Sequence, residues 1–464
     1  MLPLLPAPLV AQIAPATTPT TAPLSFSAPT PTRGFIQQPQ EIRELPGKLN
    51  EVLVFNSNSP EVVQTEGILL STFPSFGKLY PSAHLNQAFS KRFDLFSHHI
   101  ARPVNGKTVY QGVIVYNPNL EPVTLDVLQA VSYLTNPDAP FIDLPPQVEN
   151  PYGRVYSGPG SRLTLDVLRG VNQPGFPSKL VILPKQSRMI LNLPISTGTA
   201  RSTYMKLQSD RPVYMANLAM HSSFGQPPSL AAWQELLRRG NLVSPRDRVP
   251  TAPDKIEATL AARLRKIYGR VAGVAKGSEW QGEIVDTPKG ASLTIPQRGK
   301  AFTYPLSTVT LGTLATGQVQ SAPMVVRYPD TAYRAHGNYG VHYNLTLPLT
   351  NNSQEPQTVT LSIQTPLIHE KGKNILWFYE PPGQVFFRGT IQISYKDDRG
   401  KTQTRYVHLV QRQGEQGQPL VTLTLPPGDR RQVGVDFLYP PDATPPQALT
   451  VKTLEMSAPI SQAK

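Results

Sequence analysis

The strongest constraint on the fold is a pattern of residues that occurs twice, far apart along the chain. In residues 110–131, alternating apolar residues approach a corner at Asn117, cross a Glu-Pro pair and leave on a second alternating run. Residues 339–363 show the same order around a corner at Asn351. A period of two is typical of strands that bury one face. Two copies of one β-sandwich-like module therefore explain the pattern.

A second shared signal follows each copy. Residues 183–188 read Leu-Pro-Lys-Gln-Ser-Arg and residues 425–430 read Leu-Pro-Pro-Gly-Asp-Arg, and each precedes a strand-like run, at 189–195 and 432–438. The fifty prolines agree with short strands, because proline lacks a backbone donor and belongs in corners and linkers. We expect an all-β protein with two related, immunoglobulin-like β-sandwich modules and a short helical insertion.

This expectation divides the chain into five segments. They are an export signal and Pro/Thr-rich disordered linker at 1–40, a first sandwich module at 41–225, a helical insertion and loop at 226–266, a second sandwich module at 267–455, and a polar tail at 456–464. In the insertion, Ser229 can cap a helix that Gly240 ends, with Leu230, Trp233 and Leu237 on one face. A second helix is predicted over residues 254–267.

The N-terminus favours export. Residues 1–32 carry no charge, and an apolar start is followed by small residues, as in a secretory signal, although the basic start of such a signal is missing. Either a start codon upstream supplies the basic region, or the segment is a disordered tail. No later run approaches the roughly 20 apolar residues of a membrane span, so we expect no transmembrane segment.

Composition limits the chemistry. The chain has no cysteine, which excludes disulfides, thiolate metal sites and a cysteine nucleophile. No phosphate-binding loop or zinc-protease motif is present, and Ser161 in a Gly-Pro-Gly-Ser sequence reads as a turn. His98 and His99 point to opposite faces of a strand, while His336 and His342 could converge around a glycine-rich bend. We expect no catalytic residue, no cofactor and no metal.

The net charge of +13 favours an acidic partner. A surface charge that serves only solubility explains it as well. No dense basic run or aromatic–basic interleaving indicates a nucleic-acid partner. Candidate ligand-binding residues come from the tetrapeptide Tyr-Gly-Arg-Val, which occurs twice and could present Tyr and Arg to sugars or merely form a glycine bend, and from a proline-bounded loop. They are Tyr152, Arg154, Tyr268, Arg270, Arg246 and Arg248.

A cluster of aromatic residues at 377–379, Trp-Phe-Tyr, lies beside a Pro-Pro loop. Exposed coplanar rings would make a carbohydrate platform, and buried rings would make a sandwich core. The core is the safer interpretation, with part of the cluster exposed.

Several segments resemble a family of cyanobacterial exported proteins, the domain of unknown function 3370. The resemblance rests on residues 55–72, 94–101, 148–162, 244–248 and 267–275 and extends from about 38 to 455. It implies a periplasmic, cell-surface or secreted location, and it implies no known activity and no catalytic residues.

We therefore expect a non-enzymatic binding or structural protein, whose partner is an anionic envelope polysaccharide or peptidoglycan. The alternative is a carbohydrate-active enzyme or an envelope assembly factor with Glu61, Glu66 or Glu149 in a cleft. Two carboxyl groups about 5–10 Å apart in a deep groove would favour a glycosidase.

Overall fold

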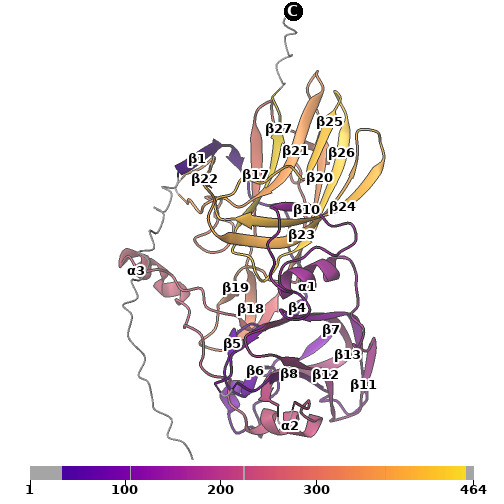
Figure 1. Ribbon diagram of the computed structural model, residues 1–464, viewed down its shortest axis with the longest axis vertical. Helices are drawn as coiled ribbons and strands as arrows, with labels where there is room; N and C mark the ends of the chain where they lie inside the picture. Colours follow the sequence, from indigo (N-terminus) through magenta and orange to yellow (C-terminus); the bar gives the residue numbers. More distant parts are fainter. Residues whose placement is uncertain (1–33, 105, 223–224, 371, 456–464) are drawn as a thin grey trace, which may run out of the picture.

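The computed structural model describes residues 34–104, 106–222, 225–370 and 372–455. These residues form 27 β-strands and three α-helices, which confirms the expectation of a mostly β protein. Figure 1 shows two β regions stacked along the long axis of the molecule, the earlier part of the chain in one and the later part in the other. Residues 1–33 of the predicted export signal and linker, and the whole polar tail at 456–464, lie outside the described residues. Residues 34–39, predicted as part of the disordered linker, form strand β1 (Gly34–Pro39), because they pair with a later strand.

The first β region is one twelve-stranded sheet that folds over on itself. Its main path is β11 (Lys179–Ile182), β9 (Val123–Leu134), β13 (Ala200–His221), β7 (Phe89–Ala101), β4 (Leu53–Ser57), β14 (Ala272–Lys276), β18 (Ala322–Arg327) and β19 (Arg334–Ala335). The remaining strands are β5 (Val62–Val63), β6 (Gly67–Ser71), β8 (Val109–Tyr116) and β12 (Ser187–Ile195).

Strand β13 joins the two layers of this region. Its first half pairs with β7 and β9, its second half pairs with β6 and β8, and the register with β7 shifts between Ser209 and Val213. The sequence predicts two separate strands here, at 203–208 and 211–220, and that prediction is wrong because the chain passes the shift without a turn. Phe93, Val113 and Met205 lie fully buried between the layers.

The second β region packs an eight-stranded sheet against a five-stranded sheet. The first consists of β10 (Gln147–Glu149), β24 (Thr402–Arg412), β23 (Val385–Lys396), β26 (Arg430–Leu438), β20 (His342–Thr350), β15 (Glu279–Glu283), β3 (Lys48–Leu49) and β16 (Leu293–Thr294). The second consists of β2 (Glu41–Ile42), β17 (Ala301–Leu306), β27 (Gln447–Thr453), β21 (Gln357–Gln364) and β25 (Val421–Leu425). Alternate residues such as Tyr343, Leu361 and Ile393 form the core between them.

The two Asn corners make the same hydrogen bonds. Each Asn amide donates to two backbone carbonyls, those of Glu121 and Ile182 for Asn117 and those of Glu355 and Leu425 for Asn351. Each side-chain oxygen accepts from the backbone N–H two residues on. Both Asn residues are fully buried, so the sequence signal marks a structural lock rather than a surface turn.

Strand pairing around the corners also corresponds. β8 pairs with β12, and β9 pairs with β11 and β13; likewise β20 pairs with β26, and β21 pairs with β25 and β27. The return turns each hold one residue in the left-handed region, Lys185 (φ 58°) and Gly428 (φ 74°).

The helices differ from the expectation in two places. Helix α2 (Leu230–Arg239) is confirmed, with Ser229 accepting a bond from Ala232 N–H at its start. Residues 159–168 form helix α1 (Pro159–Leu168), so the predicted turn at Ser161 is wrong: Pro159 begins the helix and its apolar face is buried. The predicted helix over 254–267 shortens to a 3₁₀ turn and α3 (Ile256–Ala261), because it buries no residue. No helix in the described ranges is long and apolar enough to cross a membrane.

A two-stranded ribbon, β1 (Gly34–Pro39) with β22 (Ile375–Glu380), stands beside the second β region (Figure 1). Strands also cross between the two regions. β10 joins the sheet of the later region, whereas β14, β18 and β19 join the sheet of the earlier one. The segments that lead into and out of these strands meet at the junction of the two regions.

Candidate functional site

The junction of the two β regions contains an open cleft of about 500 Å³. Its wall comes from the loop after β4, from residues 247–271 leading to β14, and from loops of the later region that follow β17, β19, β21 and β26. Polar and charged lining residues are Asn58, Glu61, Asp247, Arg248, Arg265, Tyr268, Arg270, His336, Tyr339 and Thr444. The apolar part includes Ile267, Val309 and Ile368.

Three arginines give the cleft its positive charge. Arg270 forms an ion pair with Glu61. Arg248 and Arg265 are exposed, and within the described ranges no carboxylate oxygen lies within 4 Å of either guanidinium group. A guanidinium group offers several donors in one plane, which suits a carboxylate or phosphate ligand. The two unpaired arginines can therefore bind an anion.

Two carboxylates also face this cleft. Burial raises the pKa of Glu61, against the lowering effect of Arg270, and the nearby Asp247 raises it further. The Asp247 carboxylate accepts hydrogen bonds from the Ser59 hydroxyl (2.8 Å) and from the backbone N–H of Glu61 (3.2 Å). Both acids are thus held by partners of the protein itself.

On one side of the cleft, the Tyr268 ring contacts the side chains of His336 and Lys266. The His336 ring meets it edge-on, with centroids 4.8 Å apart, and the Lys266 ammonium lies 4.0 Å from the Tyr268 centroid. The Tyr268 hydroxyl donates to the carbonyl of Thr310. Burial lowers the pKa of Lys266 to about 8, and burial together with Lys266 lowers the pKa of His336 to about 3. His336 is neutral at physiological pH and Tyr268 is fixed in place.

Arg246 has a different role from its neighbour Arg248. Its guanidinium donates to both carboxylate oxygens of Asp330, at 2.7 and 3.2 Å, and lies 5.6 Å from the Tyr328 ring centroid. This paired side chain anchors the loop, and the loop then presents Arg248 to the cleft.

The other predicted site residues lie elsewhere. Tyr152, which is 79% exposed, and Arg154 occupy the loop between β10 and α1 and do not line the cleft. Glu66 accepts a bond from the backbone N–H of His221, and Glu149 pairs with Arg405. The structure therefore brings together Arg248, Tyr268, Arg270 and Glu61 from the predicted set.

Asp247, Arg265 and His336 are lining residues that the sequence did not single out as binding groups. They come from separate loops, and only the proximity of residue 247 to the predicted Arg246 and Arg248 gave a signal. The sequence indicates for His336 only that it could converge with His342, and the described part of the chain holds no group of three or more His, Asp and Glu residues placed to bind a metal ion.

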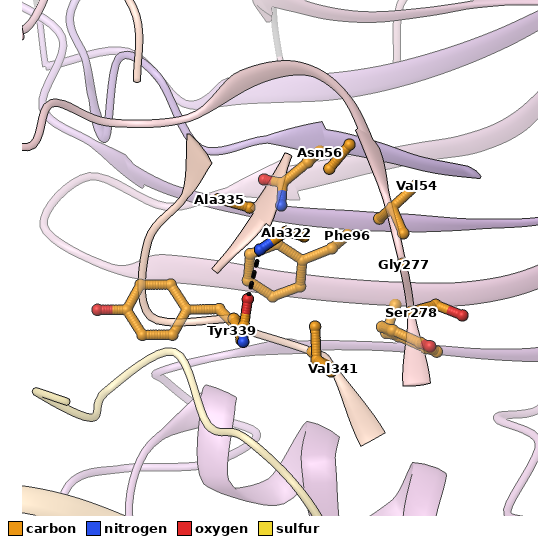
Figure 2. A pocket seen from close by; sticks show the side chains of 13 residues that line it. Val54, Asn56, Phe96, Gly277, Ser278, Ala322, Ala335, Tyr339 and Val341 are labelled. Carbon is orange, nitrogen blue, oxygen red and sulfur yellow. Dashed lines mark hydrogen bonds between the residues drawn. The ribbon is translucent and has the colours of Figure 1, made fainter. Parts of the chain in front are cut away.

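Next to the cleft, the junction is closely packed. Figure 2 shows side chains of Val54, Phe96, Ala322, Ala335 and Tyr339 around a void of only about 10 Å³. The dashed line is the bond from the Ala322 backbone N–H to the side-chain oxygen of Asn338, 3.0 Å. Such a void holds no ligand larger than a water molecule. Tyr339 lines both the void and the cleft, so the closely packed part of the junction adjoins the wall of the cleft.

Among curated proteins, none matches this chain. Solved structures give weak likenesses. Lac15 from a marine microbial metagenome is 9% identical, with a TM-score of 0.12 over 89% of this chain and 67% of its own. A multicopper oxidase from Campylobacter jejuni is 7% identical, with a TM-score of 0.11 over 78% of this chain and 53% of its own. The coconut allergen cocosin is 10% identical, with a TM-score of 0.11 over 80% and 84%. TM-scores this low do not indicate a shared fold.

A family model gives a clear result. The model described as "Protein of unknown function (DUF3370)" matches residues 40–453, which is most of the chain and includes every residue that lines the cleft. The chain therefore belongs to the DUF3370 family.

Proposed function

We propose that this protein is an exported, periplasmic or cell-surface protein that binds an anionic envelope polymer, a polysaccharide or peptidoglycan, without changing it chemically. The setting follows the exported cyanobacterial proteins that the sequence resembles. The observation that carries the proposal is the cleft, where two unpaired arginines adjoin apolar residues and Tyr268. A polymer with repeated acidic groups fits such a surface, because its charges meet the guanidinium groups and its backbone covers the apolar part.

The architecture that supports this function is a pair of related, immunoglobulin-like sandwich modules. The matching hydrogen bonds of Asn117 and Asn351 and the matching strand pairing around them support a common origin of the two modules. Two rigid modules joined by crossing strands would hold a cleft between them in one shape, as a binding site requires.

A carbohydrate-active enzyme is the second candidate, and one observation favours it. Glu61 has a raised pKa and lies near Asp247, an arrangement that glycosidases use to keep one carboxyl group protonated. However, Arg270 pairs with Glu61, and Asp247 already accepts two hydrogen bonds from the chain. These partners leave the acids poorly placed to act on a substrate, so binding is the better conclusion. An envelope assembly factor has no particular observation in its favour.

Calorimetric titration with polygalacturonate, which has a carboxylate on every sugar, tests the proposal. R248A/R265A should bind about tenfold more weakly than the wild type, since each exposed charge contact contributes about 0.2–1 kcal/mol. R188A/R399A is the matched control, because it removes two exposed arginines that do not line the cleft. Equal losses in both variants would mean that the positive charge acts only as a general surface property.

Incubation with the same polymer distinguishes binding from catalysis. Wild-type protein incubated with polygalacturonate should release no new reducing ends, and E61Q should retain binding. Release of reducing ends by the wild type that E61Q abolishes would establish the glycosidase alternative instead.

A further inference from the structure

The ribbon formed by β1 and β22 has one buried face and one aromatic face. Its register pairs Phe35 with Tyr379 and Gln37 with Trp377. Because successive residues of a strand point to opposite faces, Leu376 and Phe378 lie on the other side, where they are 1% and 0% exposed. The ribbon is therefore fastened to the protein by one face and presents three aromatic rings with the other.

These three rings form one surface. The Phe35 centroid lies 5.5 Å from that of Tyr379 and 6.3 Å from that of Trp377, and Phe35 is 64% exposed. The His369 ring lies 5.1 Å from Trp377. The indole nitrogen of Trp377 is buried and has no hydrogen-bond partner within the described ranges, although buried Trp indoles usually have one. The outward side of the ribbon thus presents aromatic rings, while the indole N–H lies beneath the surface.

The aromatic surface continues into the basic cleft. A groove of about 380 Å³ is lined by Phe35, Trp377 and Tyr379, and it shares Ile368 and Pro445 with the cleft. The groove is aromatic, and the adjoining cleft carries the unpaired Arg248 and Arg265. A ligand long enough to cover both would need apolar ring faces and acidic groups in the same chain.

An acidic polysaccharide has both features. The C–H faces of its sugar rings pack on aromatic rings, its hydroxyl groups accept hydrogen bonds, and its acidic groups recur along the chain. A proline-rich peptide also fits an aromatic groove, but it would bring no negative charge to the arginines. The adjoining cations therefore favour the sugar polymer.

We propose that Phe35, Trp377 and Tyr379 form a sugar-stacking subsite that continues the cleft, so that the ligand is an acidic polysaccharide segment spanning both. This inference rests on the proposed function and specifies its ligand. A short oligosaccharide occupies the basic cleft alone, whereas a longer one also covers the aromatic ribbon.

Titration calorimetry with oligogalacturonides of increasing length tests the inference. W377A should weaken binding of long oligomers about tenfold or more and leave binding of the shortest oligomer that the wild type binds unchanged. R248A/R265A should weaken both. F35A is the second aromatic variant, because Phe35 is mostly exposed and its loss should leave the fold intact. F76A removes an aromatic ring that is 96% exposed and lies outside the groove, and serves as the control.

The outcomes separate the two proposals. If W377A and F35A bind long oligomers like F76A while R248A/R265A is impaired, the stacking subsite is refuted and the anionic cleft stands. If the wild type binds no oligogalacturonide and no polygalacturonate, the proposed function fails as well. If a neutral proline-rich peptide binds with the same dependence on Trp377 while long oligogalacturonides do not, the groove takes peptides and the sugar assignment is wrong.

Discussion

Removal of either corner amide should destabilise the fold strongly and by a similar amount. Asn117 donates two bonds of 2.7 and 2.9 Å and accepts one of 2.8 Å from a backbone N–H, and Asn351 donates two of 2.8 Å and accepts one of 3.0 Å. At about 1 kcal/mol net for each of these three bonds to the backbone, N117A and N351A should each lower the free energy of unfolding by about 3 kcal/mol. Each side-chain oxygen also accepts a bond from a side chain, that of Asn119 or Ser353, and its loss adds to this value. Carbonyl groups left without partners in a buried site would keep the loss near or above this value.

Urea unfolding followed by circular dichroism measures this loss. N352A is the control, because Asn352 is exposed and should change stability by no more than about 0.5 kcal/mol. If the two β regions unfold in separate transitions, N117A should shift one of them and N351A the other. A loss below about 1 kcal/mol in either corner variant would refute the assignment of the corners as equivalent structural locks.

Three further predictions concern stability. R246A should lower the free energy of unfolding by about 1.5–3 kcal/mol, the range for a charge-assisted hydrogen bond, and R248A should leave it unchanged. Equal melting temperatures for both variants would contradict their different roles. Burial raises the pKa of Asp442 to about 6, so the protonated carboxyl stabilises the fold fully below about pH 4, and this stabilisation is lost as the pH rises through 6. D442N should therefore become more stable relative to the wild type as the pH rises over that range. A difference in stability that stays constant with pH would contradict the raised pKa of Asp442. A Cβ on Gly112 would lie 2.6 Å from the Trp233 ring, so G112A should lower the free energy of unfolding by about 1–3 kcal/mol. The loss should be smaller when G112A is made in a W233L variant. An equal loss in that variant would show that the Trp233 ring is not what the new methyl group meets.

The sequence predicted those parts of the fold that local chemistry determines. The Asn corners, the alternating strands and helix α2 all depend on residues close together in the chain. The failures have physical causes: α1 begins with Pro and Gly, which read as a turn, and its burial depends on distant strands. Residues 262–267 have an apolar spacing that suits a helix, but no part of the fold covers that face.

The sequence predicted only some of the residues that line the cleft. Arg248, Tyr268 and Arg270 were singled out from a loop and a repeated tetrapeptide. Arg265 and Phe35 carried no signal, because each reaches the site through distant pairing. Arg265 precedes β14, which joins the sheet of the earlier region, and Phe35 lies in β1, which pairs with β22 more than 300 residues later. The aromatic cluster at 377–379 was predicted as mainly core, and the structure divides it between a buried Phe and two outward rings.

Salt dependence of polygalacturonate binding tests the anionic cleft most directly. Between about 0.1 M and 1 M salt, the screening length falls from about 10 Å to about 3 Å. Wild type and R188A/R399A should lose affinity steeply over this range, while R248A/R265A starts weaker and declines far less, because the charges that salt screens are already absent. The same steep decline in all three proteins would contradict the assignment of Arg248 and Arg265 as the anion-binding groups.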